Sequence, residues 1–243
     1  MAQFVLVHGA WHGAWCWKKV LPILRAAGHE VHAVSLTGVG ERAHLLNADI
    51  NLRTHINDVL AVIRHEELTD VILVGHSYAG MVITGVADEL LKNTIHPLKH
   101  LVYLDAVTPH NGESWSSRHT PETRAARIAS AAEEGGLALP VSDAAVFGLT
   151  GDDLHWVNRR MTPHPIGVYQ DVLHFNAPRL AQLPRTFIDC TSPALKTIAV
   201  MRERVRTEPY WNVVEIETGH DAMISAPAPL CHVLLNLKET YVD

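Results

Sequence analysis

The sequence predicts an α/β fold built on one mostly parallel sheet. Two kinds of segment, strand-like runs and helical segments, support this prediction by their alternation. Apolar, β-branched runs alternate with segments whose apolar residues recur at a helical period. Such alternation specifies a parallel sheet that is covered by helices on both faces. The alternation stops once, between about residues 107 and 180, where prolines, alanine-rich pieces and scattered aromatics take over. We therefore expect a single domain over 1–243, with a core of 1–106 and 181–243 and an inserted helical cap over 107–180.

Each element of this fold follows from its own stretch of sequence. Six short runs have the length and composition of buried strands: 4–9, 30–36, 71–75, 101–105, 185–190 and 211–217. Helical periodicity predicts the segments between and after them: 15–27, closed by Gly28, then 54–66, 78–92, 193–206 and 224–238. Functional sites in such sheets lie at the carboxyl ends of the strands.

One serine lies at a strand-to-helix junction with small neighbours. In "VILVGHSYAGMV", residues 71–82, the period changes from strand to helix at Ser77. Gly75 precedes this serine by two places, and Ala79 and Gly80 follow it. A sharp, strained turn of this kind is typical of a nucleophile elbow, although its usual pattern ends in glycine where this chain has Ala79. The junction therefore predicts a nucleophilic serine at the edge of the sheet.

A serine nucleophile requires a base and donors for an oxyanion. His220 follows the last predicted strand, in "TGHDAM", so its loop reaches the same sheet edge as Ser77. The amide of Tyr78 follows the nucleophile, and the amide of Ala10 belongs to "HGAWHG", the loop after the first strand. We expect His220 to act as the base and these two amides to form the oxyanion hole.

Composition excludes several other classes of protein. The chain has 20 basic and 26 acidic residues and no basic run, so it lacks the charge of a nucleic-acid binder. It shows no signal-peptide pattern and no apolar segment approaching the about 20 residues of a membrane span, so we expect no membrane partner. Three cysteines without a C-x-x-C spacing argue against a disulfide framework and favour a cytoplasmic location. The sequence leaves the oligomeric state open, with a homodimer as one option.

Two motifs for cofactors or metals are set aside. "GVGERA", residues 38–43, has the spacing of a dinucleotide fingerprint, but it follows the second strand instead of the first. His8 and His12 have a metal-like spacing, which aligns two ligands only on a helix, and no glutamate follows His8. We therefore predict no cofactor and no metal site.

Several stretches together resemble a known family. These are "FVLVHGAWHGAWCW", "LTGVGERAHLL", "VILVGHSYAGMV", "LVYLDAVTPHNGES", "MTPHPIG" and "TGHDAM", which cover most of the chain. They resemble the α/β-hydrolases related to plant salicylate methylesterases and hydroxynitrile lyases, and especially bacterial esterase relatives that include hydrolases of the carbamate carbendazim. The resemblance implies an α/β-hydrolase fold, in which the nucleophile precedes the histidine in the chain, and a serine esterase that cleaves a small-molecule ester or carbamate.

Two positions distinguish ester hydrolysis from cyanohydrin cleavage within this family. The hydroxynitrile lyases carry a threonine where this chain has Gly9, and a lysine after the catalytic histidine where this chain has Asp221. That lysine stabilises cyanide, which an aspartate would repel. The comparison favours hydrolysis of an ester, thioester or carbamate.

The acid of the triad is missing from its usual place. Family members carry an aspartate shortly after the strand that corresponds to the run 185–190, in "C-T-x-D", but this chain reads "CTSP", with Pro193 at that position. Ser192 and Pro193 instead have the pattern of a helix N-cap and first helical residue. Asp105, at the end of the strand 101–105, is the leading candidate for the acid. The alternatives are Asp189, Glu217 and a Ser–His dyad without an acid.

The substrate pocket is predicted from the loop after the first strand and from the aromatic residues of the cap. The candidates are Trp11, Cys16, Trp115, Trp156 and Phe175. These side chains favour a substrate with a neutral, aromatic or otherwise apolar body. Two rival functions stay open at this point: a small-ligand receptor or carrier that has lost turnover, and a lyase that uses the same serine and histidine.

Overall fold

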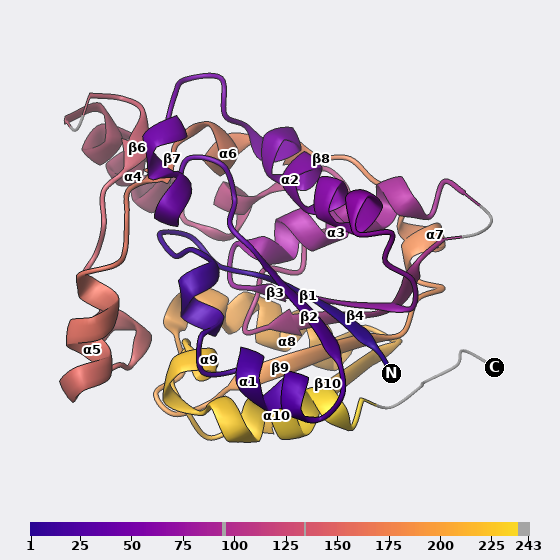
Figure 1. Ribbon diagram of the computed structural model, residues 1–243. Coiled ribbons are helices and arrows are strands. Elements are labelled where there is room, and N and C mark those ends of the chain that lie inside the picture. The colour runs from indigo at the N-terminus through magenta and orange to yellow at the C-terminus, as the bar shows by residue number, and fades with distance from the viewer. Residues whose placement is uncertain (94–95, 134, 238–243) are drawn as a thin grey trace.

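The computed structural model describes residues 1–93, 96–133 and 135–237, and one six-stranded sheet forms its centre (Figure 1). All its strand pairs are parallel, in the order β10-β9-β4-β3-β1-β2. Each strand falls on one of the six predicted runs, which confirms the predicted sheet. The strands are β1 (Gln3–Val7), β2 (Glu30–Val34), β3 (Val71–His76), β4 (Leu98–Leu104), β9 (Arg185–Cys190) and β10 (Trp211–Ile216).

Helices cover both faces of this sheet. α2 (Leu52–His65) and α3 (Ala79–Leu90) pack together on one face, and α1 (Leu21–Ala26) and α10 (Pro227–Leu235) on the other (Figure 1). The predicted helix 15–27 is divided into a 3-10 turn, Ala14–Trp17, and α1. Pro22 explains the division, because it fits the first turn of α1 but would break a continuous helix. The predicted end of the last helix, residue 238, lies outside the described residues.

The helix predicted to start at Pro193 begins later, so that prediction is wrong. A 3-10 turn, Lys196–Ile198, leads into α8 (Ala199–Thr207). The amides of Thr191 and Ser192 donate to the carbonyls of Ile216 and Thr218, at 3.1 and 2.9 Å. These bonds prolong the pairing of β9 with the chain that follows β10, and the Ser192–Pro193 peptide is cis. The segment is thereby held as a loop.

Between β4 and β9 the described residues form two-residue strands, short 3-10 turns and helices, of which α4 is the longest. Two small antiparallel pairs, β5 with β8 and β6 with β7, tie this stretch together. In Figure 1 its helices α4 and α5 lie at the side of the molecule away from the chain's N-terminus. Treating 107–180 as a cap on a single-domain core stays our proposal. The elements are β5 (Glu113–Ser114), a 3-10 turn (Trp115–Arg118), α4 (Pro121–Glu133), β6 (Ala138–Leu139), a 3-10 turn (Ala144–Phe147), α5 (Gly151–Asn158), β7 (His164–Pro165), α6 (Gly167–Gln170), β8 (Val172–Leu173) and α7 (Ala177–Leu180).

The remaining elements are a 3-10 turn, Gly40–Leu45, and α9 (Ala222–Ser225). Among the described residues, none of the helices combines the length and the apolar character that crossing a membrane requires.

Candidate active site

Ser77 lies on a tight corner between β3 and α3. Its φ is +54°, a left-handed conformation that non-glycine residues rarely adopt and that is typical of functional sites. Small neighbours make the corner possible: a Cβ at Gly75 would lie 2.8 Å from the Ala79 carbonyl oxygen, and one at Gly80 would lie 1.9 Å from the Val107 oxygen. The position that needs glycine is thus Gly80, which explains why the chain accepts Ala79 before it.

His220 and Asp105 are in direct contact. Nδ1 of His220 lies 2.6 Å from Oδ2 of Asp105, and both side chains are buried. Asp105 comes immediately after β4, which neighbours β3, and the Ser77 amide donates to the Leu104 carbonyl at 3.1 Å. Within the described residues the structure gives the Ser77 hydroxyl no hydrogen bond, and such contacts often tighten only when substrate binds. The structure thus brings a carboxylate and an imidazole together at the strand end beside Ser77.

Arg202 holds the other side of the Asp105 carboxylate. Its Nη2 donates to Oδ1 of Asp105 at 2.7 Å, and its Nε donates to Asp189. Asp189 also accepts from Arg206 at 2.6 Å, so both of its oxygens are occupied by arginines. Glu217 is exposed. Of the three acids considered from sequence, only Asp105 contacts His220.

Pro193, at the family's usual acid position, packs against backbone near the catalytic loop. A Cβ at Gly148 would lie 2.7 Å from the Pro193 ring and 3.1 Å from Gly219, the residue before His220. The His220 amide donates to the Phe147 carbonyl at 2.9 Å. This packing helps to hold the His220 loop, but it supplies no acid.

The peptide that carries the Ala10 amide is oriented by His8. The Leu36 amide donates to Nε2 of His8 at 3.1 Å, so the ring carries its proton on Nδ1 and donates it to the Gly9 carbonyl at 2.7 Å. Because N–H and C=O point in opposite directions across a trans peptide, fixing the Gly9 carbonyl also fixes the Ala10 N–H. A Cβ at Gly9 would lie 2.9 Å from Cβ of Ser77, so this loop touches the nucleophile.

Two further histidines hold the next peptide of this loop. Nδ1 of His12 lies 2.7 Å from the Ala10 carbonyl, and the Trp11 amide donates to Nδ1 of His164, in the cap, at 3.3 Å. Trp11 has a φ of +65°. Among the described residues, neither the Ala10 nor the Tyr78 amide donates a backbone hydrogen bond of a turn or loop, so both are free to bind an oxyanion.

His12 and Asp221 form a buried ion pair behind the catalytic loop. Nε2 of His12 lies 3.1 Å from Oδ2 of Asp221, so both ring nitrogens of His12 face acceptors and both carry protons. Burial by itself lowers the pKa of His12, but the Asp221 carboxylate and the Ala10 carbonyl outweigh it and raise this pKa. Burial by itself would raise the pKa of Asp221. The neighbouring histidines, His12 above all, outweigh burial and bring this pKa below its ordinary value.

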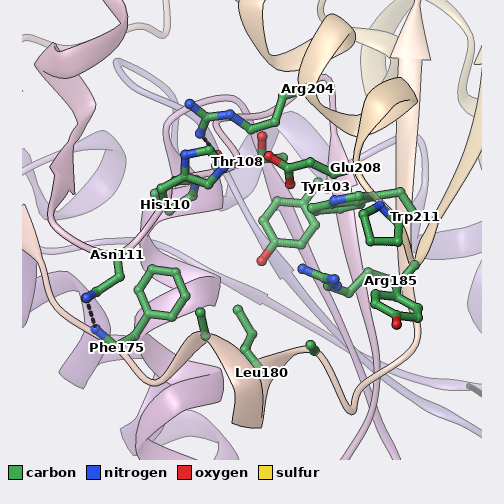
Figure 2. A pocket seen from close by; sticks show the side chains of 15 residues that line it. Tyr103, Thr108, His110, Asn111, Phe175, Leu180, Arg185, Arg204, Glu208 and Trp211 are labelled. Atoms are coloured by element: carbon green, nitrogen blue, oxygen red, sulfur yellow. Dashed lines mark hydrogen bonds and ion pairs between the residues drawn. The ribbon is translucent and has the colours of Figure 1, made fainter.

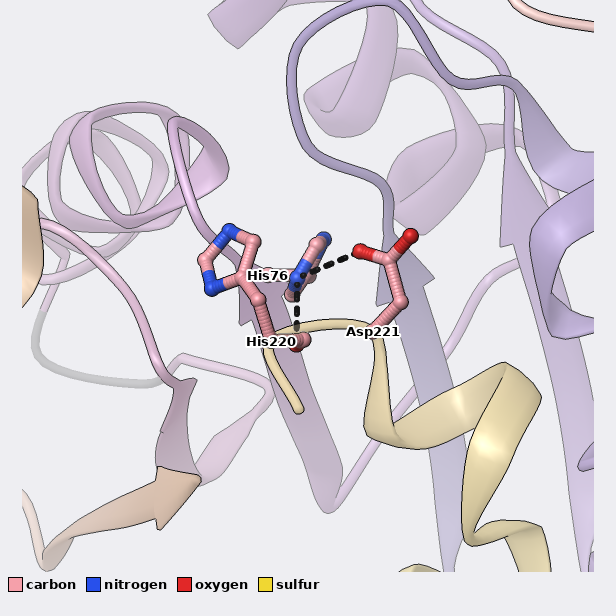
Figure 3. A group of neighbouring side chains, drawn as sticks. All are labelled: His76, His220 and Asp221. Atoms are coloured by element: carbon pink, nitrogen blue, oxygen red, sulfur yellow. Dashed lines mark hydrogen bonds and ion pairs between the residues drawn. The ribbon is translucent and has the colours of Figure 1, made fainter. Parts of the chain in front are cut away.

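His76 joins this pair to His220. Figure 3 shows its ring between the His220 carbonyl, 3.1 Å from Nε2, and Oδ1 of Asp221, 3.5 Å from the same atom. The ligand atoms of His76, His220 and Asp221 lie within 4.8 Å of one another, as in a metal site. However, Nε2 of His76 carries the proton that it donates to the carbonyl, and Nδ1 of His220 faces Asp105, so these nitrogens serve hydrogen bonds.

Two of the predicted pocket residues, Trp11 and Trp115, are buried and form an aromatic wall with Tyr78, the residue after Ser77. Trp11 follows the oxyanion loop and lies 6.1 Å from Trp115, whose ring lies 4.9 Å from that of Tyr78. The guanidinium of Arg127, in α4, lies over both tryptophans, at 5.7 and 6.0 Å from their centroids. Arg118 lies 5.8 Å from Trp115. The sequence pattern gave no sign of these cations on the wall.

The other three predicted pocket residues lie elsewhere. Cys16 is fully buried, and burial raises the pKa of its thiol well above the ordinary value. Trp156, in α5, packs on Trp15 at 5.1 Å. Phe175 lines a separate cavity that contains none of Ser77, His220 and Asp105. Local composition did not reveal which aromatics of residues 107–180 pack against Trp11 and Tyr78, because that depends on how this segment folds.

Because several histidines are buried, we expect the fold to lose stability at acidic pH. Burial lowers the pKa of His8 to about 3 and of His55 to about 4, and it also lowers the pKa values of His76 and His164. The unfolded chain therefore binds more protons below pH 6.5, and the free energy of unfolding should fall by about 5 kcal/mol per pH unit as pH drops from 6 toward 4. His12 has the opposite effect on stability. Because its pKa is raised in the folded protein, its stabilising contribution is complete below pH 6.5 and is lost as pH rises.

Denaturant unfolding followed by circular dichroism at pH 7.5 and 5.5 measures this change. The midpoint should fall sharply at the lower pH. An unchanged midpoint would show that these histidines are not neutral in the fold.

Asp221→Asn is expected to lower the free energy of unfolding by about 3 kcal/mol, because it leaves the buried His12 imidazolium without its counter-charge. The matched control is Asp153→Asn, which breaks an exposed pair with Lys19 and should cost less than about 1 kcal/mol. Chemical denaturation at pH 7 measures both. Equal losses in the two variants would contradict a charged His12–Asp221 pair.

Comparison with known proteins places the chain in a family. The model of the "Alpha/beta hydrolase family" matches residues 4–233. The chain belongs to this family. It is 41% identical over 246 residues to a carbendazim hydrolyzing esterase of Nocardioides sp. (strain SG-4G), covering 98% of this chain and all of that protein. It is 28% identical over 259 residues to methylesterase 7 of Arabidopsis thaliana, covering 98% of this chain and 97% of the relative.

Solved structures agree with the predicted α/β-hydrolase fold. An extracellular alpha/beta-hydrolase from a Paenibacillus species aligns with a TM-score of 0.86 and 19% identity, over 99% of this chain and all of the other. A pyrethroid hydrolase from Sphingobium faniae JZ-2 aligns with a TM-score of 0.71 and 21% identity, over 96% of each chain. The resemblance and the fold predicted from the sequence are both confirmed.

Proposed function

We propose that the protein is a serine hydrolase that cleaves a carboxylic ester or a carbamate through an acyl-enzyme intermediate. The 2.6 Å contact between Asp105 and His220 is the observation that carries this proposal, because it supplies the acid whose usual position holds Pro193. The left-handed corner at Ser77 supports the role of this serine as nucleophile. The names of the relatives, an esterase and a methylesterase, support the same class of reaction.

The residues have distinct roles in the proposed mechanism. Ser77 Oγ attacks the substrate carbonyl carbon while Nε2 of His220 takes the hydroxyl proton. Asp105 accepts from Nδ1–H of His220, which fixes the tautomer and stabilises the imidazolium that forms. The amides of Ala10 and Tyr78 donate to the oxyanion.

Collapse of the tetrahedral intermediate breaks the bond to the leaving group. That group takes the proton held by His220, and the acyl group stays on Ser77. Water then attacks the acyl carbon, giving its proton to His220, and the acid or carbamic acid is released as Ser77 regains its proton. Every proton is thus returned, and the cycle requires no cofactor.

The aromatic wall supports a substrate with an apolar or aromatic body. Trp11 follows Ala10 in the chain, and Trp115 packs on the ring of Tyr78, so both belong to the segments that carry the two proposed oxyanion amides or contact them. The similarity to a carbendazim hydrolyzing esterase supports carbamates as one substrate class. A cytoplasmic location and a homodimer stay predictions from the sequence.

The two rival functions have less support. The receptor or carrier hypothesis rested on the missing triad acid. In the proposed mechanism Asp105, directly after β4, takes the role of that acid. Against a cyanohydrin lyase, a Cβ at Gly9 would lie 2.8 Å from Nδ1 of His76 and 2.9 Å from Ser77, so a threonine would not fit without movement. The Asp221 side chain, which faces His12 and His76, is an anion and would repel cyanide where the lyases place a cation.

Covalent labelling tests the proposal. A fluorophosphonate probe should label the native protein, with the added mass on the peptide that contains Ser77. The same preparation should hydrolyse p-nitrophenyl esters in a screen of esters, lactones and carbamates. A native, folded protein that takes up no probe and hydrolyses none of these compounds would refute the proposal.

A further inference from the structure

A second cavity lies where the segment between β4 and β9 leaves and rejoins the sheet (Figure 2). Its volume is about 350 Å³, within the range of pockets that hold small molecules. Residues from β4, from the stretch just after it, from α7, from the start of β9 and from the end of α8 line it. Ser77, His220 and Asp105 are not among them. The cavity is therefore distinct from the proposed active site.

Several aromatic side chains line this cavity. Tyr103 and Trp211 meet edge to face, with their ring centroids 5.1 Å apart. Phe175 and Leu180 lie on the side toward α7, as Figure 2 shows. The Tyr103 hydroxyl is already bonded to Thr84 Oγ1 at 2.8 Å, so this ring presents its apolar part. The shape and chemistry of the walls suit a flat aromatic ring.

One cation on the wall lacks an anionic partner. Arg204 is bonded by both terminal nitrogens to Glu113, at 2.8 and 2.9 Å, and Glu208 is paired with His110 at 2.6 Å. The side chain of Arg185 makes no hydrogen bond or ion pair in the part of the chain that the structure describes, and its guanidinium lies over the Trp211 ring at 4.5 Å. Burial lowers the pKa of Arg185, and the charge of Glu208 opposes this only in part.

Within the described residues, two hydrogen-bond donors of the cavity wall are also without a partner. Nε of Arg185 and Nε1 of Trp211 are both buried without an acceptor. A buried donor without an acceptor costs free energy, so an acceptor brought by a ligand would be favourable here. Arginine binds carboxylates through two parallel hydrogen bonds, which makes a carboxylate the anion that best matches this group.

We propose that this cavity binds a small aromatic carboxylate, with its ring against Tyr103, Phe175 and Trp211 and its carboxylate on the guanidinium of Arg185. The exposed terminal nitrogens of Arg185 make the charged contact, and the aromatic walls supply the apolar one. This binding involves no step of ester hydrolysis, so it does not depend on the proposed function.

Calorimetric titration with 2-naphthoate tests the proposal. The protein is first phosphonylated at Ser77, so that naphthoate cannot occupy the active site. Saturable binding of one naphthoate per chain is expected, at least about ten-fold tighter than binding of the neutral 2-naphthamide. If phosphonylation fails, which would count against the proposed function alone, the untreated protein serves, because Arg185 is not part of that site.

Three variants connect the binding to these residues. Arg185→Gln should lower the affinity for naphthoate about ten-fold or more and leave the affinity for naphthamide unchanged. Phe175→Ala should weaken both compounds. The matched control Arg179→Gln, on α7 but outside the cavity, should change neither. Denaturation midpoints establish that each variant is folded. Absence of saturable naphthoate binding to the native protein, or equal naphthoate affinity in native protein and folded Arg185→Gln, would overturn the proposal.

Discussion

Ser77→Ala is expected to lower kcat for ester hydrolysis by about 10⁶-fold, the size of the loss when the serine of a protease triad is removed. The reason is that no other group of this site is placed to form the acyl-enzyme. The oxyanion amides and the binding surface would be left to act on water alone. Hydrolysis of a p-nitrophenyl ester, corrected for the buffer rate, measures the effect.

The matched control is Ser225→Ala. Its hydroxyl pairs with Thr218 at 2.7 Å, near the His220 loop but away from the proposed chemistry. Its activity should stay within a few-fold of native. If Ser77→Ala keeps a tenth of the native rate while folded, another nucleophile must be responsible.

Asp105→Asn should lower kcat by about 10⁴-fold, as the corresponding change does in a serine protease. Asparagine can present its NH₂ group to Nδ1 of His220, which favours the tautomer with the proton on the wrong nitrogen. The substrate would still bind, so KM should change far less than kcat. Steady-state kinetics over a range of pH separates these effects.

Asp189→Asn provides the control for this variant. Asp189 shares Arg202 with Asp105, so its replacement disturbs the same cluster of arginines without touching His220. We expect near-native kcat and a measurable loss of stability. Similar losses of kcat in the two variants would mean that the arginine cluster matters and that Asp105 does not orient the base.

The sequence predicted the sheet well because its strands are short and the central ones, β1, β3 and β4, are apolar and largely buried. Val71 to Val74, for example, have the composition of a strand covered on both faces, and the change of period at Ser77 marks the corner. The position of His220 followed from the same logic, since it comes directly after the last strand. These features are local, so composition and spacing are sufficient to find them.

The acid could not be chosen from sequence, because its position depends on contacts between distant parts of the chain. Asp105 and His220 are 115 residues apart, and they meet because β4 lies between β3 and β9 in the sheet. Arg202, from α8, occupies Asp189. Spacing alone made Asp105 the leading candidate but left Asp189, Glu217 and a dyad without an acid open.

The histidines around the oxyanion loop were missed for a similar reason. His12 was considered only as a metal ligand, and its partner Asp221 lies 209 residues away. His164 lies in the cap, yet it accepts from the Trp11 amide 153 residues earlier. The sequence did place His8 in the turn, but its tautomer follows from the Leu36 amide, which only the fold brings near.

A crystal structure of the fluorophosphonate-inhibited protein tests the central claim most directly, because it captures nucleophile, base, acid and oxyanion hole together. We expect phosphorus bonded to Ser77 Oγ, a phosphonyl oxygen within hydrogen-bonding distance of the Ala10 and Tyr78 amides, and Nδ1 of His220 still on Asp105. Phosphorus on another side chain, or His220 turned away from Asp105 toward a different acid, would contradict the account.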